Sequence, residues 1–267
     1  MARELKFNDV GEDVRLLQRA LNEIMQNTIK ADGHFGKLTE EALRAYQSAQ
    51  GLPVNGVYGP RVQEQIEPYI ANRFLTVENI AEAADRADIP VAMVLAVREV
   101  EGRSEGFLAD RRPIILFERH KFWHNLANRR GKMFADNIVN VHPDICNSQR
   151  GGYLGYAREY DRLEKAAGID KDAAHMSASW GTFQIMGSNH RISGYPKLDD
   201  FINAAYNSEI DHLNMVINFI VNQPNMLQAA RQFNFTRFAT LYNGPAQQGY
   251  DHRLQQAVHK YKSLGFN

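Results

Sequence analysis

The feature that most constrains the fold is a short internal repeat near the amino terminus. The segment DGHFG at residues 32–36 is followed 23 residues later by NGVYG at residues 55–59. In both segments an Asp-Gly or Asn-Gly pair favours a turn with positive φ. Each turn precedes a helical pattern, one with Thr39 as the expected N-cap and one beginning near Pro60. An earlier apolar stripe, with Asp13 as its expected N-cap, adds a third helix, so the repeat predicts a compact three-helix unit.

The rest of the chain also carries mostly helical patterns. Thr76 is an expected N-cap, and Pro90 stands where the next helix would begin. That helix, PVAMVLAVREVE, is apolar on nearly every side and is predicted to be buried. Further helical patterns occur at 154–167, 199–222, 224–233, 236–242 and 247–263. Only residues 113–118 suggest a short strand or hairpin arm, so we expect a mainly α fold with two domains, residues 1–72 and 73–267.

Composition and motifs limit the partners that we expect. The 31 basic and 31 acidic side chains give no net field that would attract nucleic acid or an anionic membrane. The single cysteine, Cys146, excludes an internal disulfide or a thiolate metal cluster. No apolar run approaches the roughly 20 residues of a membrane helix, and the first residues do not resemble a signal peptide. The nine histidines include no H-E-x-x-H motif, and no phosphate loop is present, so we expect no metal and no cofactor.

Glu101 is the strongest candidate for acid–base chemistry. It falls in the last turn of the predicted buried helix, before Gly102, a residue type common just after a helix. The negative end of the helix dipole disfavours an ionised carboxylate there by roughly 0.3–1 kcal/mol. Apolar neighbours would favour the protonated form further. Such an acid can donate a proton near neutral pH, although a solvated glutamate at a helix end fits the same position.

Glu118 is the candidate for a second catalytic group. It follows the apolar run at 113–117 and precedes Arg119 and His120. An ion pair with Arg119 would account for it structurally. If Glu101 acts as the acid of a reaction such as glycoside hydrolysis, a second group must hold water or stabilise positive charge at the anomeric carbon. By its chemistry Glu118 suits that role best.

The amino-terminal repeat resembles the type 1 peptidoglycan-binding domain. The resemblance rests on VGEDVRLLQRAL followed by DGHFGKLTEEALRAYQSAQGLPVNGVYG, which covers about a quarter of the chain. Such a domain holds a wall polymer and does no chemistry. The resemblance implies that wall binding involves residues of this motif: Asp32, Gly33, Phe35, Tyr46, Gln47, Asn55 and Tyr58.

The larger part resembles the lysozyme-like superfamily, and more narrowly the N-acetylmuramidase domain of modular phage endolysins. Three ordered segments carry the resemblance: VREVEG at 97–102, SWGTFQIMG at 179–187 and LYNGP at 241–245. It implies a lysozyme-like catalytic domain in which Glu101 corresponds to the general acid. It also implies that peptidoglycan glycan strands are the partner.

The same resemblance implies a set of sugar-binding residues. Those on the segment that lines the groove and on the motif that closes it are Ser179, Thr182, Gln184, Tyr242 and Asn243. Thr182 is also a candidate to position water, and Gly181 is expected to let the backbone approach the ligand closely. Pro245 stands where the transglycosylases have glycine, so their backbone contacts are not carried over. Trp180, Phe107 and Tyr153 suit either sugar stacking or the core.

These expectations combine into one function. We expect an endolysin of the lysozyme class that binds peptidoglycan and hydrolyses the β-1,4 bond between N-acetylmuramic acid and N-acetylglucosamine. A lytic transglycosylase that forms 1,6-anhydro ends, and a non-catalytic wall-binding protein, are the alternatives. The phage resemblance implies a protein that stays in the host cytoplasm until the inner membrane is breached and then reaches the periplasm and wall.

Overall fold

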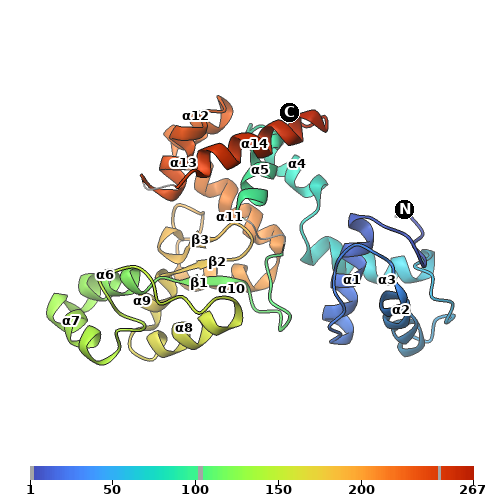
Figure 1. Ribbon diagram of the computed structural model, residues 1–267, viewed down its shortest axis with the longest axis horizontal. Helices are drawn as coiled ribbons and strands as arrows, with labels where there is room; N and C mark the ends of the chain where they lie inside the picture. The colour runs from blue at the N-terminus through green and yellow to red at the C-terminus, as the bar shows by residue number, and fades with distance from the viewer. Residues whose placement is uncertain (1–2, 102–104, 246–247) are drawn as a thin grey trace. The chain divides into compact units, whose positions relative to one another are not determined.

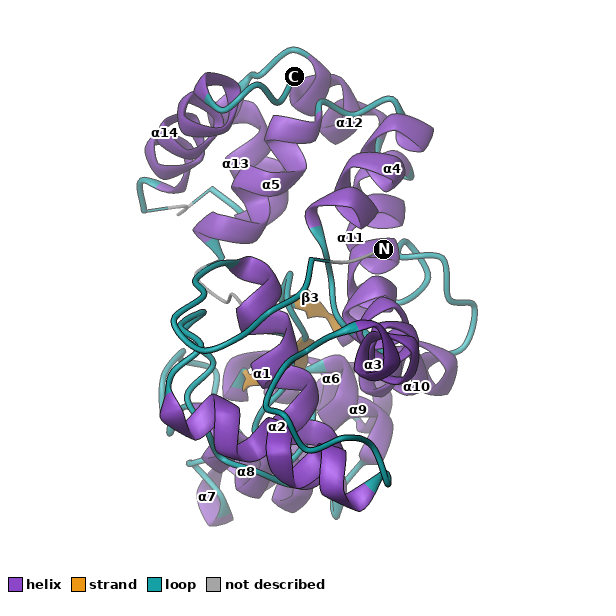
Figure 2. Cartoon of the chain, turned by 90° about the vertical axis from the view of Figure 1, so that its right-hand side faces the viewer, coloured by secondary structure: helices purple, strands orange, loops and turns teal. Residues whose placement is uncertain are grey.

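The computed structural model of the chain describes residues 3–101, 105–245 and 248–267. The chain divides into two compact units, Met1–Phe74 with Ala109–Arg111, and Leu75–Leu108 with Arg112–Asn267. Helices predominate in both (Figure 2), which confirms the mainly α fold class. In the described part of the chain no helix is long and apolar enough to cross a membrane.

The amino-terminal unit is the expected three-helix unit. Its helices are α1 (Glu12–Met25), α2 (Lys37–Ala49) and α3 (Pro60–Arg73). Two predicted N-caps are wrong, because Gly11 and Gly36 occupy those positions. Asp13 lies one residue inside α1. Thr39 lies inside α2, where its buried hydroxyl accepts a hydrogen bond from Gln18 Nε2 at 2.9 Å.

The two repeated turns are each held by a glutamine from the preceding helix. Gln18 Oε1 accepts from the Gly33 amide, and Gln47 Oε1 accepts from the Gly56 amide, both at 2.9 Å. Each glutamine also donates from Nε2 to the backbone carbonyl of the residue that follows the glycine. The glycines have φ values of +75° and +71°, which L side chains adopt only at a cost. The internal repeat therefore consists of two turns that are each held by a glutamine in the same way, and we call it the Gln–turn repeat.

The larger unit holds the remaining elements. Its helices are α4 (Val77–Ala87), α5 (Val91–Val100), α6 (Arg119–Arg130), α7 (Lys132–Val141), α8 (Glu159–Ala167), α9 (Lys171–Met176), α10 (Leu198–Asn207), α11 (Glu209–Val221), α12 (Pro224–Arg231), α13 (Phe235–Asn243) and α14 (Tyr250–Ser263), with short 3₁₀ turns η1 (Tyr156–Arg158) and η2 (Gly187–Asn189). Its strands are β1 (Ile115–Phe117), β2 (Ala178–Trp180) and β3 (Ile185–Met186).

Local signals account for several of these boundaries. Thr76 caps α4 in a capping box with Asn79, as its position predicted. The helical pattern at 199–222 forms two helices, because Ser208 is extended and its side chain accepts from the Asp211 amide, so it starts α11. The helix α5 carries a continuous buried run from Ala92 to Val97. This confirms the prediction of a buried helix ahead of Glu101.

The small sheet was predicted only in part. Its order is β1-β2-β3, with both pairs antiparallel. Trp180 pairs with Ile115 on one side and with Ile185 on the other. The segment 179–187 therefore contains most of the β2–β3 hairpin.

Within the larger unit the elements form two parts (Figure 1). The helices α4, α5, α12, α13 and α14 gather in one part, and the sheet with α6–α9 forms the other. The helix α11 contacts α4 and α12 of the first part and also packs against α10. The helix α14 packs along α5, and Lys260 Nζ of α14 lies 2.7 Å from Glu99 Oε2. The carboxyl end of α5 is thus held in place by α14, a helix of the same part of the unit.

Candidate active site

One groove of about 630 Å³ brings together all of the predicted catalytic and sugar-binding residues except Thr182. It lies where the end of α5 and the end of α13 approach the sheet and the start of α6. Both candidate carboxylates line it. The described lining residues are Glu101, Leu116, Glu118, His120, Lys121, Arg150, Ser179, Gln184, Ile185, Met186, Ser188, Asn189, Phe219, Tyr242, Asn243, Gly244 and Pro245.

Glu101 ends the buried helix and is itself half-buried. Its amide donates to the Val97 carbonyl at 3.1 Å, so the residue continues the last turn of α5. Gly102, the predicted residue after the helix, lies outside the described residues. The Tyr250 hydroxyl donates to Glu101 Oε1 at 2.9 Å. The carboxyl group is thereby oriented by a hydrogen bond from α14.

Two stacked tyrosines lie near the Glu101 carboxyl group. The rings of Tyr242 and Tyr250 lie 6.0 Å apart and almost parallel. Burial raises the pKa of both hydroxyls well above the usual value, and the charge of Glu101 raises it further. Both therefore stay protonated and remain hydrogen-bond donors. Tyr250 was not predicted, because it lies 149 residues from Glu101 along the chain.

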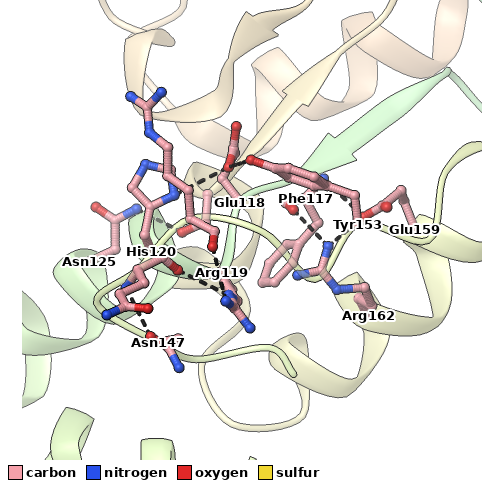
Figure 3. Close-up of polar contacts among 12 residues, drawn as sticks. Phe117, Glu118, Arg119, His120, Asn125, Asn147, Tyr153, Glu159 and Arg162 are labelled. Carbon is pink, nitrogen blue, oxygen red and sulfur yellow. Dashed lines mark hydrogen bonds and ion pairs between the residues drawn. The ribbon is translucent and has the colours of Figure 1, made fainter. Parts of the chain in front are cut away.

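Glu118 does not form the ion pair with Arg119 that would have given it a purely structural role. Its Oε2 accepts from the Tyr153 hydroxyl at 2.7 Å and lies 3.2 Å from His120 Nδ1 (Figure 3). Within the described residues Oε1 has no hydrogen-bond partner. Tyr153 is 45% exposed, so it belongs to the surface of the site and not to the core. The tyrosine fixes one carboxylate oxygen and leaves the other available.

A buried ion pair holds the segments that carry Glu118 and Tyr153 (Figure 3). Glu159 is fully buried, and its Oε2 lies 2.7 Å from Arg162 Nη1. Its Oε1 accepts from the amides of Leu154 and Gly155, the two residues after Tyr153.

The same pair also fixes the strand before Glu118. Arg162 Nη1 donates to the Phe117 carbonyl at 2.9 Å, and the Phe117 amide lies 3.4 Å from Glu159 Oε2. Both ends of the Tyr153–Glu118 hydrogen bond are therefore tied to one buried ion pair. No spacing in the sequence indicated this arrangement.

Ser179 of β2 and Gln184, just before β3, both line the groove. The Ser179 hydroxyl donates to Gln184 Oε1 at 2.9 Å. Gln184 Nε2 donates to the carbonyls of Gly181 and Ile114. Gln184 itself has φ +50°, a conformation that costs energy for a residue with a side chain. Its hydrogen bonds hold this conformation and present the pair to the groove.

Thr182 and Gly181 have other roles than expected. Thr182 is fully buried and does not line the groove, and its amide and hydroxyl both lie 3.2 Å from His212 Nδ1. A Cβ added at Gly181 would lie 2.6 Å from the His212 ring. The glycine therefore makes room for His212 of α11 rather than for a ligand. The corrected role of both residues is to seat the hairpin on α11.

Tyr242 and Asn243 end α13 at the edge of the groove. The Tyr242 hydroxyl donates to the Phe183 carbonyl at 3.0 Å, so it ties α13 to the β2–β3 hairpin. Asn243 is exposed and lines the groove. Of the other aromatic candidates, Trp180 and Phe107 are buried, and both belong to the core.

The predicted wall-binding residues divide into buried and exposed groups. Phe35, Tyr46, Gln47 and Tyr58 are buried, so the structure assigns them to the core of the amino-terminal unit. Asp32 and Asn55 are exposed, and each accepts from the amide two residues later in its turn. The amide of His34 holds the pKa of Asp32 below its usual value.

A second groove lies on the amino-terminal unit itself. It measures about 370 Å³. Its described lining residues are Glu4, Gln47, Leu52, Pro53, Asn55, Val57, Gly59, Pro60, Arg61 and Val62. Most of the predicted wall-binding residues thus belong to the core or the turns of the unit and do not line this groove.

Known proteins resemble both parts of the chain. The N-acetylmuramidase family matches residues 90–262, and a peptidoglycan binding domain matches residues 10–66. A Burkholderia AP3 phage endolysin of known structure is 37% identical, with a TM-score of 0.65 over 98% of this chain and 100% of that chain.

A shorter match concerns one curated protein. The N-acetylmuramoyl-L-alanine amidase CwlM of Mycobacterium tuberculosis is 44% identical over 50 residues, which is 19% of this chain. The matched part spans only 12% of that amidase.

The family match spans the groove and both of its glutamates, and the peptidoglycan binding match spans the Gln–turn repeat. The chain therefore belongs to the N-acetylmuramidase family and is a peptidoglycan-binding cell-wall hydrolase of the phage endolysin kind.

Proposed function

We propose that the protein hydrolyses the β-1,4 bond between N-acetylmuramic acid and N-acetylglucosamine in peptidoglycan, as lysozymes do. The observation that carries the proposal is that Glu101 and Glu118 line one groove, the first from the end of α5 and the second from the end of β1. Each carboxyl group accepts a hydrogen bond from a tyrosine hydroxyl. Two oriented carboxyl groups across a sugar groove are what glycoside hydrolysis requires.

In the proposed mechanism Glu101 is the general acid. It protonates the glycosidic oxygen as the bond to the anomeric carbon breaks through an oxocarbenium-like state. Tyr250 orients the carboxyl group, since its hydroxyl stays protonated and donates to Oε1. The partly buried site strengthens this interaction, because less water competes for the carboxyl group.

Glu118 is the proposed second group. Its Oε2 is held by Tyr153, and its Oε1 is available to accept a hydrogen bond from water or to stabilise the cation. Water then adds to the anomeric carbon, its proton passes to Glu118, and a reducing muramic acid end is formed. Ser179, Gln184 and Asn243 are the proposed polar contacts to the sugars, because they line the groove beside these carboxyl groups.

We also propose that the amino-terminal unit holds the enzyme on the wall while the groove cleaves it, so that the protein lyses its host. Clearing of outer-membrane-permeabilised cells tests this part of the proposal. A protein that binds the wall without clearing the suspension would contradict it.

Product analysis of digested wall tests the chemistry. Mass spectrometry should find reducing muramic acid ends. A lytic transglycosylase uses the same acid but closes the muramic 6-hydroxyl onto the anomeric carbon, so a predominance of 1,6-anhydro ends would refute hydrolysis. Glu118→Gln should slow hydrolysis severely, and an unaffected rate would remove Glu118 from the mechanism.

A further inference from the structure

The groove contains two cations that the proposed reaction does not use. Lys121 and Arg150 are exposed and line it, and among the described residues neither forms an ion pair with a carboxylate. The sugar backbone of peptidoglycan carries only hydroxyl and acetamido groups, which are uncharged. These hydroxyl and acetamido groups therefore give the two cations nothing to pair with.

Arg119, at the start of α6, holds the loop that carries Arg150, and Lys121 follows two residues later on the same helix (Figure 3 shows Arg119). Arg119 donates to the carbonyls of Pro143, Gln149 and Arg150, at 3.2, 3.0 and 2.9 Å. The Asn147 amide returns a hydrogen bond to the Arg119 carbonyl at 3.3 Å. The loop that carries Arg150 is thus tied to Arg119, the residue that follows Glu118.

The neighbouring basic side chains do not share this role. Arg119 directs its guanidinium to backbone carbonyls rather than into the groove. Burial lowers the pKa of His120, against the opposing effect of Glu118, and the charges of Arg150 and Lys121 lower it further. The imidazole is therefore neutral at neutral pH, and Lys121 and Arg150 are the cations of this wall.

The positive charge lies on one side of the groove. The side formed by α11 and the end of α13 contributes Phe219, Tyr242, Asn243 and Pro245, all of them uncharged. A ligand with carboxylates on one edge and neutral sugar elsewhere would match this distribution.

Peptidoglycan is such a ligand. Muramic acid carries a lactyl ether whose carboxyl group is either free or linked to a stem peptide, and the stem peptide has carboxylates of its own. We propose that Lys121 and Arg150 form a carboxylate-binding subsite that recognises the acidic substituent of muramic acid. This inference rests on the proposed function, because it assumes that the groove binds the glycan strand. The subsite distinguishes wall glycan from neutral N-acetylglucosamine polymers.

Binding measurements on the full chain test the subsite. All proteins carry Glu101→Gln so that the ligand is not cleaved, and the protein with this substitution alone is the parent. Calorimetry at low salt compares the double variant Lys121→Gln/Arg150→Gln with this parent. Lys197→Gln is the matched control, since Lys197 is exposed and does not line the groove. The ligands are a peptide-bearing wall tetrasaccharide, the same tetrasaccharide with free lactyl carboxylates, and chitotetraose, which has no carboxylate. For any one ligand the amino-terminal unit contributes equally to every variant, because all substitutions lie outside it.

We expect the double variant to raise Kd for acidic ligand by roughly three- to tenfold and to weaken its salt dependence. Its Kd for chitotetraose should change by less than about twofold, and the control should match the parent. A loss confined to the peptide-bearing ligand assigns the subsite to the carboxylates of the stem peptide, and a loss confined to the other acidic ligand assigns it to the free lactyl carboxylate. An equal loss on both shows that the subsite accepts either carboxylate. An unchanged Kd for the acidic ligands, or an equal loss for chitotetraose, overturns the subsite. If the parent binds none of the three ligands, the groove is not a glycan site, and the proposed function fails as well.

Discussion

Replacing Glu159 by glutamine should destabilise the larger unit far more than its conservative size suggests. Both carboxylate oxygens accept from N–H donors, Oε1 from two backbone amides and Oε2 from Arg162 and a third amide. An amide side chain has one NH₂ group, which must face N–H donors in either orientation. The substitution also leaves the guanidinium of Arg162, 3% exposed, without its carboxylate.

The expected cost follows from that geometry. Breaking a buried ion pair by removing one partner costs about 3–5 kcal/mol. For a unit of 150–250 residues each kcal/mol lowers the melting temperature by roughly 2–4 °C. The melting temperature should therefore fall by about 6–20 °C, and the urea midpoint by about 1–2 M.

Tryptophan fluorescence during urea unfolding measures this loss in the right part of the chain. The protein has two tryptophans, Trp123 and Trp180, and both lie in the larger unit. Glu82→Gln is the control, because Glu82 and Arg86 are about 70% exposed and 4.0 Å apart, a pair worth about 0–1 kcal/mol. A Glu159→Gln protein whose midpoint matches the control would refute the argument.

Three further substitutions probe the site. Gly181→Ala adds a Cβ at φ +70°, 2.6 Å from the His212 ring. The free energy of unfolding should therefore fall by about 2–4 kcal/mol, and an unchanged free energy of unfolding would contradict this. Tyr153→Phe removes the hydrogen bond to Glu118, so kcat should fall about tenfold. Stability should hardly change, because the ring is exposed. Equal kcat values for the variant and the parent would show that the contact is dispensable. Burial is the main cause that lowers the pKa of His120 in the folded protein. The folded state therefore prefers the neutral imidazole, and its stability is full above the unfolded pKa of about 6.5. That stability is lost as the pH falls towards the lower pKa of the folded state. Unfolding midpoints from pH 7.5 to 5.5 should decline in the parent and less steeply in His120→Gln, and parallel curves would exclude this cause.

Local signals in the sequence predicted the parts of the fold that depend on neighbouring residues. The cap at Thr76 and the buried helix ahead of Glu101 were confirmed, since both need only a few consecutive side chains. The helix α6 was missed because its twelve residues are mostly polar and only His120, Phe122 and Leu126 are buried. Its apolar stripe is too sparse to stand out.

Contacts between distant segments could not be predicted in the same way. The pairing of Ile115 with Trp180 depends on how two segments 65 residues apart meet. The function of Gly181 was misassigned for this reason, because the ring that requires its missing side chain belongs to His212. The hydrogen bond from Tyr153 to Glu118 also joins residues from separate loops. The sequence alone identified the candidate carboxylates, whereas their supporting groups come from tertiary structure.

The central claim is that Glu101 supplies the proton that breaks the glycosidic bond. The most direct test is the rate at which purified sacculi release reducing muramic acid ends, measured by mass spectrometry for the parent and for Glu101→Gln. The variant must also unfold at the same urea concentration as the parent, so that a lost rate is not a lost fold. We predict a fall of roughly 10²–10⁴-fold, the usual contribution of a general acid. A folded Glu101→Gln protein that keeps its rate within about tenfold of the parent would contradict the account.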